Sequence, residues 1–266
     1  MAHVYVSSEN AHMRKSRSDW LVPAGLIVLS LVPAIAGTAR VAGLAAEATI
    51  TPENARFVAA PLPVVLHVLS AIPYSVFGAL QFSNALRRRG ARWHRISGRA
   101  LVPCAVLVAL SGLWMTLTYP WPAGDGTAVY FERLVFGVAM LVSVMIGVHA
   151  IRQRDFRAHG DWMTRAYAIA LGAGTQVLTH IPWMLFATGK PGETARGVMM
   201  GAGWVINVIV AEWAIRRTRN RVNRTARRLE REQLPHRGAR PLQSRGFGLR
   251  EDDVQVVPAT GAAGSI

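Results

Sequence analysis

The feature that most constrains this chain is a series of long apolar runs that alternate with short, strongly basic segments. A helix of about 20 apolar residues is long enough to cross a bilayer. Because lipid offers no hydrogen bonds, a spanning segment must satisfy its backbone internally, as a helix does. We therefore predict an all-α, polytopic transmembrane bundle with six spans, at residues 20–39, 62–86, 100–118, 132–151, 166–188 and 197–215.

The positions of the arginines predict the orientation of the bundle. The N-terminal tail, the segments 87–99 and 152–165, and the segment after Ile215 all fall on one side of six spans. By the positive-inside rule this side is cytoplasmic, so both termini are expected there, in a bacterial inner (cytoplasmic) membrane. Three regions follow: a cytoplasmic tail at 1–19, the membrane domain at 20–215, and a basic, largely disordered cytoplasmic tail at 216–266.

The first apolar run has a second interpretation. Small residues at Gly43-Leu44-Ala45 resemble a signal-peptide cleavage site. The run at 20–39 is longer than the roughly 7–15 residues of a typical signal-peptide core, which favours an uncleaved first span.

Composition narrows the classes of partner and chemistry. A chain that is 51% hydrophobic with a net charge of +15 fits apolar spans joined by basic segments. Because the basic residues border apolar runs, anionic lipid headgroups are the expected partner, and nucleic acid is not. The single cysteine, Cys104, excludes an internal disulfide. The sequence holds no HExxH, GxSxG or P-loop motif, which leaves hydrolytic chemistry without support.

Polar residues inside the predicted spans are candidates for function, because they are costly in lipid. His67, Tyr74 and Gln81 follow at intervals of seven and form one polar stripe on the second span. His180 lies in the fifth span at a depth similar to that of His67. Two such histidines could be the axial ligands of a b-type haem. Alternatively, each could simply hydrogen-bond across the bundle.

A second group of candidates lies at the expected cytoplasmic face. His94 and His159 each lie among arginines of the two basic segments. A second cofactor could bind there, with His149 as a further candidate ligand. The favoured alternative is an electrostatic clasp, in which arginines of these segments pair with lipid phosphate and with nearby carboxylates, namely Asp155, Asp161 and Glu212.

Two motifs carry a family resemblance. His94-Arg95-Ile-Ser-Gly98-Arg99 reads HRxxGR, and His159-Gly-Asp-Trp162-Met163-Thr-Arg165 reads HxxWMxR. With these motifs and His67, Gly78 and Gln81, the chain resembles the predicted bacterial membrane proteins of the domain of unknown function numbered twenty-three-zero-six. That resemblance implies no activity. It marks His67, Gln81, His94, Arg95, Arg99, His159, Trp162 and Arg165 as motif positions. The layout is also similar, by analogy only, to the cytochrome b561 group.

Three functional hypotheses remain open at this point. The first is a haem b electron-transfer protein, with His67 and His180 as ligands and with quinone or a redox protein as partner. The second is a non-enzymatic membrane bundle, transporter-like or a scaffold, in which the polar stripe lines a cavity or joins helices. The third is an enzyme acting on a lipid headgroup held by the arginines.

Overall fold

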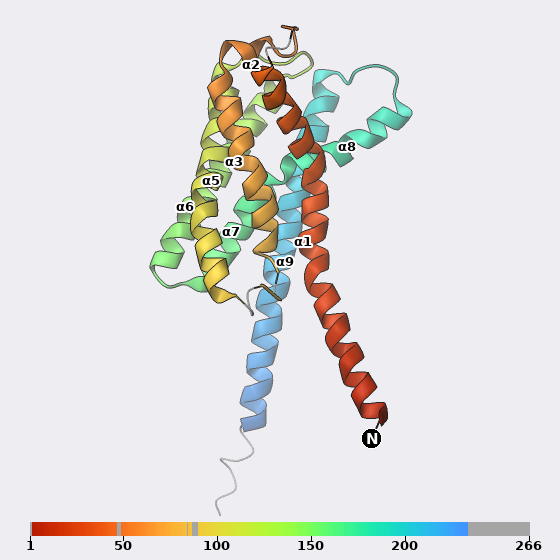
Figure 1. Ribbon diagram of the computed structural model, residues 1–266, viewed down its shortest axis with the longest axis vertical. Helices are drawn as coiled ribbons and strands as arrows, with labels where there is room; N and C mark the ends of the chain where they lie inside the picture. The colour runs from red at the N-terminus through yellow and green to blue at the C-terminus, as the bar shows by residue number, and fades with distance from the viewer. Residues whose placement is uncertain (1, 47–48, 84, 87–89, 234–266) are drawn as a thin grey trace, which may run out of the picture. The chain divides into compact units, whose positions relative to one another are not determined.

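The structure is a computed structural model that describes residues 2–46, 49–83, 85–86 and 90–233 (Figure 1). In the part of the chain so described, every regular element is a helix. The helices are α1 (Ala2–Ala45), α2 (Ala55–Ala59), α3 (Pro61–Leu80), α5 (Ala91–Thr118), α6 (Thr127–Arg152), α7 (Phe156–Ala170), α8 (Gly172–Phe186) and α9 (Glu193–Gln233). The described residues up to Arg219 form one compact unit, and the described residues from Asn220 onward belong to a second.

Five helical segments are long and apolar enough to cross a membrane, at residues 20–45, 61–80, 92–118, 127–152 and 193–230. They correspond to five of the six predicted spans and confirm an all-α membrane protein. The second predicted span, 62–86, is shorter in the structure, because α3 ends at Leu80. The residues before Trp20 form the first part of α1. The predicted C-terminal tail is helical as far as Gln233, and its remainder lies outside the described residues.

The predicted fifth span, residues 166–188, is the exception. It is divided between α7 and α8, two helices of 15 residues each, which meet at Leu171. Glycines allow close packing just after this break. A Cβ atom on Gly172 would collide with the Trp204 side chain of α9, and one on Gly174 would collide with the backbone oxygen of Leu29 in α1. The broken helix therefore brings α8 against two neighbours that a bulkier sequence would hold away.

Together, α7 and α8 run antiparallel to α9. Six polar contacts show this, because the residue numbers rise along α7 and α8 as they fall along α9. The pairs are Asp161 with Arg219, Arg165 with Glu212, Ala168 and Thr175 with Asn207, Gln176 with Met200, and Thr179 with Met199. At 1.5 Å per residue, the stretch of α9 from Met199 to Arg219 is about 30 Å long. The α7–α8 pair therefore lies along a stretch of α9 that is about as long as the hydrocarbon core of a bilayer is thick.

The other helices of the first unit pack in sequence order, with α3 against α1 and α5, α5 against α6, and α6 against α7. A buried cluster from α3, α5, α6 and α7 forms the core. At its centre Tyr167 of α7 lies against Gly78 of α3, and its hydroxyl donates to the carbonyl of Ser75 at 2.6 Å. This close contact fixes α7 against α3.

Candidate functional site

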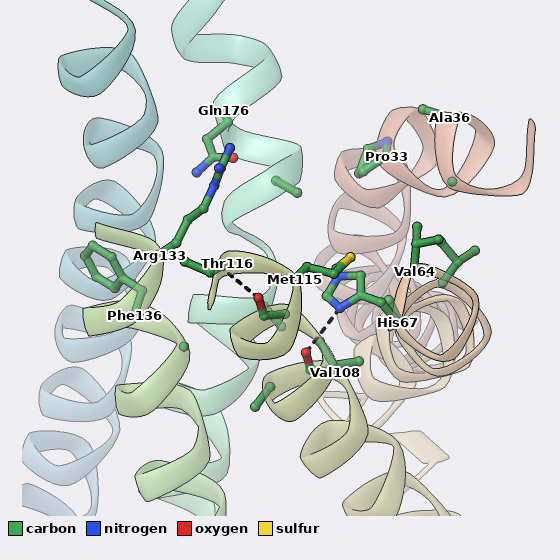
Figure 2. Close-up of a pocket in the computed structure, with 18 of the residues that line it drawn as sticks. Pro33, Ala36, Val64, His67, Val108, Met115, Thr116, Arg133, Phe136 and Gln176 are labelled. Atoms are coloured by element: carbon green, nitrogen blue, oxygen red, sulfur yellow. Dashed lines mark hydrogen bonds between the residues drawn. The ribbon is translucent and has the colours of Figure 1, made fainter. Parts of the chain in front are cut away.

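A cavity of about 490 Å³ lies among the helices of the first unit. Its walls come from α1, α3, α5, α6, α8 and α9, with contributions from α2 and α7 (Figure 2). It extends from the end of the bundle that carries α2, here called the α2 end, to the level of Tyr74 and Ile169. A volume of this size is in the range of cavities that bind small molecules.

His67 is one of the polar residues on the α3 wall of this cavity. Its Nδ1 atom lies 3.1 Å from the carbonyl oxygen of Val108 and 3.1 Å from the hydroxyl of Ser111, both on α5 (Figure 2). A carbonyl oxygen can only accept, so Nδ1 must donate in the bond to Val108. In the neutral ring Nε2 is then left as an acceptor. The ring lies beside Gly112, where a Cβ atom would be in van der Waals contact with its Cε1 atom at 3.5 Å.

The structure divides the predicted polar stripe of α3 into two parts. Tyr74 lines the cavity with His67. Gln81, at the other end of the helix, is not among the lining residues; its amide donates to the Ser97 hydroxyl of α5 at 2.7 Å. His67 and Tyr74 therefore belong to the cavity, whereas Gln81 joins two helices.

Arginines gather at the α2 end of the cavity. The guanidinium groups of Arg40 and Arg56 lie 4.3 and 4.6 Å from the centroid of the Phe57 ring. Arg133 forms an ion pair with Asp125 at 2.7 Å. Burial lowers the pKa of Arg56, and the positive charges of Arg40 and Arg133 lower this pKa further. The three guanidinium groups are thus close enough to repel one another.

Asp125 is the carboxylate at the centre of this group. Its side chain is only 2% exposed, accepts a hydrogen bond from Arg196 and forms an ion pair with Arg133. This pairing attaches the segment between α5 and α6 to the start of α9. Asp125 is thus paired with two arginines, Arg133 and Arg196. Among the described residues, neither Arg40 nor Arg56 forms an ion pair with Asp125.

His180 is placed differently from the prediction that paired it with His67. Its Nδ1 atom lies 2.6 Å from the carbonyl of Gln176 on its own helix, and His180 is not among the residues that line the cavity. Gln176, one turn earlier, lines the cavity instead. The two imidazoles do not share a cavity, so the geometry does not fit a haem held between them. Within the described ranges no cluster of three or more His, Cys, Asp or Glu side chains could hold a metal ion.

The first basic motif, HRxxGR, lies in the opening turns of α5. His94 is half-buried there, and Arg95 and Arg99 are exposed. Ser97, inside the motif, accepts the bond from Gln81 and donates to the carbonyl of Trp93. This motif therefore connects the start of α5 to the end of α3.

The second motif, HxxWMxR, lies on α7 and joins it to α6 and α9. The His159 Nδ1 atom is 2.9 Å from the carbonyl of Gly147 on α6. Arg165 lies over the ring of Trp162 at 4.5 Å and forms two bonds with Glu212, of 2.5 and 3.2 Å. The carboxylate clasp expected from the sequence is thus present at Arg165.

The other expected carboxylates of the clasp have different partners. Asp161 pairs with Arg219 of α9, and Asp155 caps α7 by accepting from the backbone of Ala158 at 2.8 Å. His149, proposed as a further ligand, is exposed. Arg165 is paired with Glu212 of α9, whereas Arg99 of the first motif is exposed.

Sequence reasoning missed the arginines of the cavity. A signal for them was present. Arg133 lies one residue inside a predicted span, and Arg40 and Arg56 lie in a segment assigned to the outer side, where basic residues are disfavoured. An arginine that departs from the positive-inside pattern is a reason to expect a specific role.

Comparison with known proteins places the chain in a family. A family model described as "predicted membrane protein (DUF2306)" matches residues 64–215. The chain belongs to this family. The match covers His67, Tyr74, both basic motifs and Arg133, whereas Arg40 and Arg56 precede it. Neither curated proteins nor solved structures give a match to the chain.

Proposed function

We propose that this protein is a non-enzymatic, transporter-like membrane bundle that admits an amphiphilic small molecule into the cavity beside His67. The observation that carries the proposal is the lining of the cavity. His67 and Tyr74, polar groups on an apolar span, face a space of about 490 Å³. Polar side chains inside a bilayer are expensive and usually face a partner or a water-filled space. A cavity with apolar walls and a few polar groups is the usual form of a small-molecule site.

The bundle crosses the membrane six times, with α7 and α8 together as the fifth crossing. The polar contacts of this pair along about 30 Å of α9 support that count. Both termini are then cytoplasmic in a bacterial inner membrane, the orientation favoured by the arginines of α5, α7 and α9. The α2 end of the cavity faces the outside. Exposed arginines at the other end contact anionic headgroups of the inner leaflet.

The rival reading, a haem b protein that exchanges electrons with quinone, has less support. His180, the second ligand that this reading needs, bonds the carbonyl of Gln176 on its own helix and does not line the cavity beside His67. An enzyme acting on lipid headgroups also has less support, because a wall of guanidinium groups supplies charge but no nucleophile.

Thiol labelling tests both the cavity and its orientation. In a Cys104→Ser background, Thr116→Cys places a thiol on the cavity wall, and Val138→Cys places one on an exposed face of α6. A membrane-impermeant maleimide added outside intact cells should label Thr116→Cys and leave Val138→Cys unlabelled, because maleimide reacts with the thiolate, which forms in water. Equal lack of labelling at both sites would refute an outward-facing cavity. A Soret band in protein purified after haem-replete expression, lost in His67→Ala, would favour the haem reading.

A further inference from the structure

The α2 end of the cavity carries more positive charge than its carboxylates balance. Arg40, Arg56, Arg133 and Arg196 gather around one buried carboxylate, Asp125, which is already paired with two of them. Two further acids lie nearby: Glu132, which precedes Arg133 and lies against Gly201, and the exposed Glu193, which lies against Gly126. Four guanidinium groups thus face three carboxyl groups. Guanidinium groups keep their charge even when burial disfavours it. A surplus of positive charge therefore remains beside the cavity.

Arg56 is the clearest member of this surplus. It is half-buried, lies against Phe57, and interacts with the charges of Arg40, Arg133 and Asp125. Because Asp125 is already paired with Arg133 and Arg196, Arg56 has no counter-charge of its own. Burying a charge without a counter-charge is costly. Clustered arginines would be stabilised by an anion with more than one oxygen, because a guanidinium group binds carboxylate or phosphate through two parallel bonds.

Below the arginines the cavity becomes apolar. Its walls are formed there by aliphatic and aromatic side chains, among them Ile72, Phe136, Met140 and Trp204. Trp204 stacks on Phe136 with ring centroids 4.9 Å apart, which closes this wall between α6 and α9. An anion alone would leave this part of the cavity without a partner, whereas an alkyl chain would fill it.

We propose that the cavity binds an amphiphile with an oxyanion headgroup, such as an alkyl phosphate or a fatty acid, with the headgroup at Arg40, Arg56 and Arg133 and the chain directed past His67. This inference rests on the proposed function, because it assumes that the cavity admits an amphiphile. It adds the charge of the headgroup and the direction of the chain. The Nε2 atom of His67 then lies beside the upper part of the chain, where it can accept a bond from a hydroxyl substituent.

The test uses the full chain in nanodiscs of zwitterionic lipid, with four probes that separate charge from chain. Dodecyl phosphate carries both features, dodecanol only the chain, inorganic phosphate only the charge, and dodecyltrimethylammonium the opposite charge. A ligand that binds the folded state raises the melting temperature with increasing concentration, which yields a dissociation constant. Dodecyl phosphate should bind at least about tenfold more tightly than dodecanol, a difference of about 1.4 kcal/mol.

Arg56→Gln is the decisive variant, because no ion pair of Arg56 with a carboxylate is found among the described residues, and the fold should survive its loss. Arg152→Gln, at the exposed end of α6, is the matched control. Arg56→Gln should weaken dodecyl phosphate about tenfold and leave dodecanol unchanged. Arg152→Gln should change neither.

Each other result overturns a specific part of the inference. Equal binding of dodecyl phosphate and dodecanol, insensitive to Arg56, would refute the oxyanion headgroup but leave an amphiphile cavity standing. If inorganic phosphate binds as tightly as dodecyl phosphate, the site binds small anions, and the proposal that the cavity holds an alkyl chain is refuted. If dodecyltrimethylammonium binds more tightly than dodecyl phosphate, the site prefers a cationic headgroup, and the proposed preference for an oxyanion is refuted. Failure of every probe, together with an unlabelled Thr116→Cys, would remove the proposed function itself.

Discussion

Gly78→Ala should destabilise the bundle more than any other single methyl group added to the helix interface of α3 and α7. A Cβ atom at position 78 would lie 2.6 Å from Cε2 and 2.9 Å from Cδ2 of Tyr167. Both distances are far below van der Waals contact, so the ring or the helix must move. Tyr167 has little freedom, because it is 4% exposed and lies between Tyr74 and Phe82, with ring centroids 5.7 and 5.1 Å away.

The expected magnitude follows from three contributions. Overpacking of a well-filled core costs about 1–3 kcal/mol. Displacing the ring also stretches the bond from its hydroxyl to Ser75, worth about 1 kcal/mol. Replacing glycine by alanine inside a helix stabilises the helix by about 1 kcal/mol, which offsets part of these losses. The free energy of unfolding should therefore fall by about 1–3 kcal/mol.

The measurement is reversible unfolding in mixed micelles, followed by circular dichroism of the helices. Gly98→Ala is the matched control, because it is also helical and no atom lies within 4 Å of its would-be Cβ. It should be neutral or stabilising by up to about 1 kcal/mol. Combining Gly78→Ala with Tyr167→Leu should cost less than the sum of the single changes. Equal stabilities of Gly78→Ala and Gly98→Ala, or strict additivity, would refute the reasoning.

Two further predictions concern the contacts of α9. Arg165→Gln and Glu212→Gln should each lower the free energy of unfolding, and a double-mutant cycle should give a coupling of about 0.5–3 kcal/mol, the range for side chains in direct contact; a coupling of zero would mean that the bidentate pair adds nothing. Asn207→Leu should cost about 1–2 kcal/mol in the same assay, because it removes the bonds to Thr175 and Ala168. Thr175→Val should cost less, since Asn207 keeps its second bond; the reverse order would contradict the network.

The helical architecture could be predicted because it depends on local properties of the chain. An apolar run of span length has one common solution in lipid, and the arginines flanking the runs set the expected orientation without any tertiary contact. The division of residues 166–188 into α7 and α8 was not predicted. The apolar pattern continues through Leu171, and the break depends on the approach of Leu29 and Trp204 from helices distant in sequence.

The candidate site was predicted in part. The polar stripe identified His67 and Tyr74, because polar groups on an apolar helix must face protein. It could not separate them from Gln81, which bonds Ser97, or pair His67 correctly. Equal depth suggested His180, but depth does not specify which way a side chain points around its helix axis. In the structure Gln176 rather than His180 lines the cavity.

The sequence by itself therefore determined that this chain is an all-helical membrane protein of its family, since hydropathy, charge and short motifs can be read without long-range contacts. Only the tertiary structure decided that Arg56 and Arg133 lie beside the same cavity as His67. These three residues come from α2, α6 and α3, and no periodicity within one helix relates them. The physical reason is that charges and cavities are properties of helix packing, which brings together side chains that the sequence keeps apart.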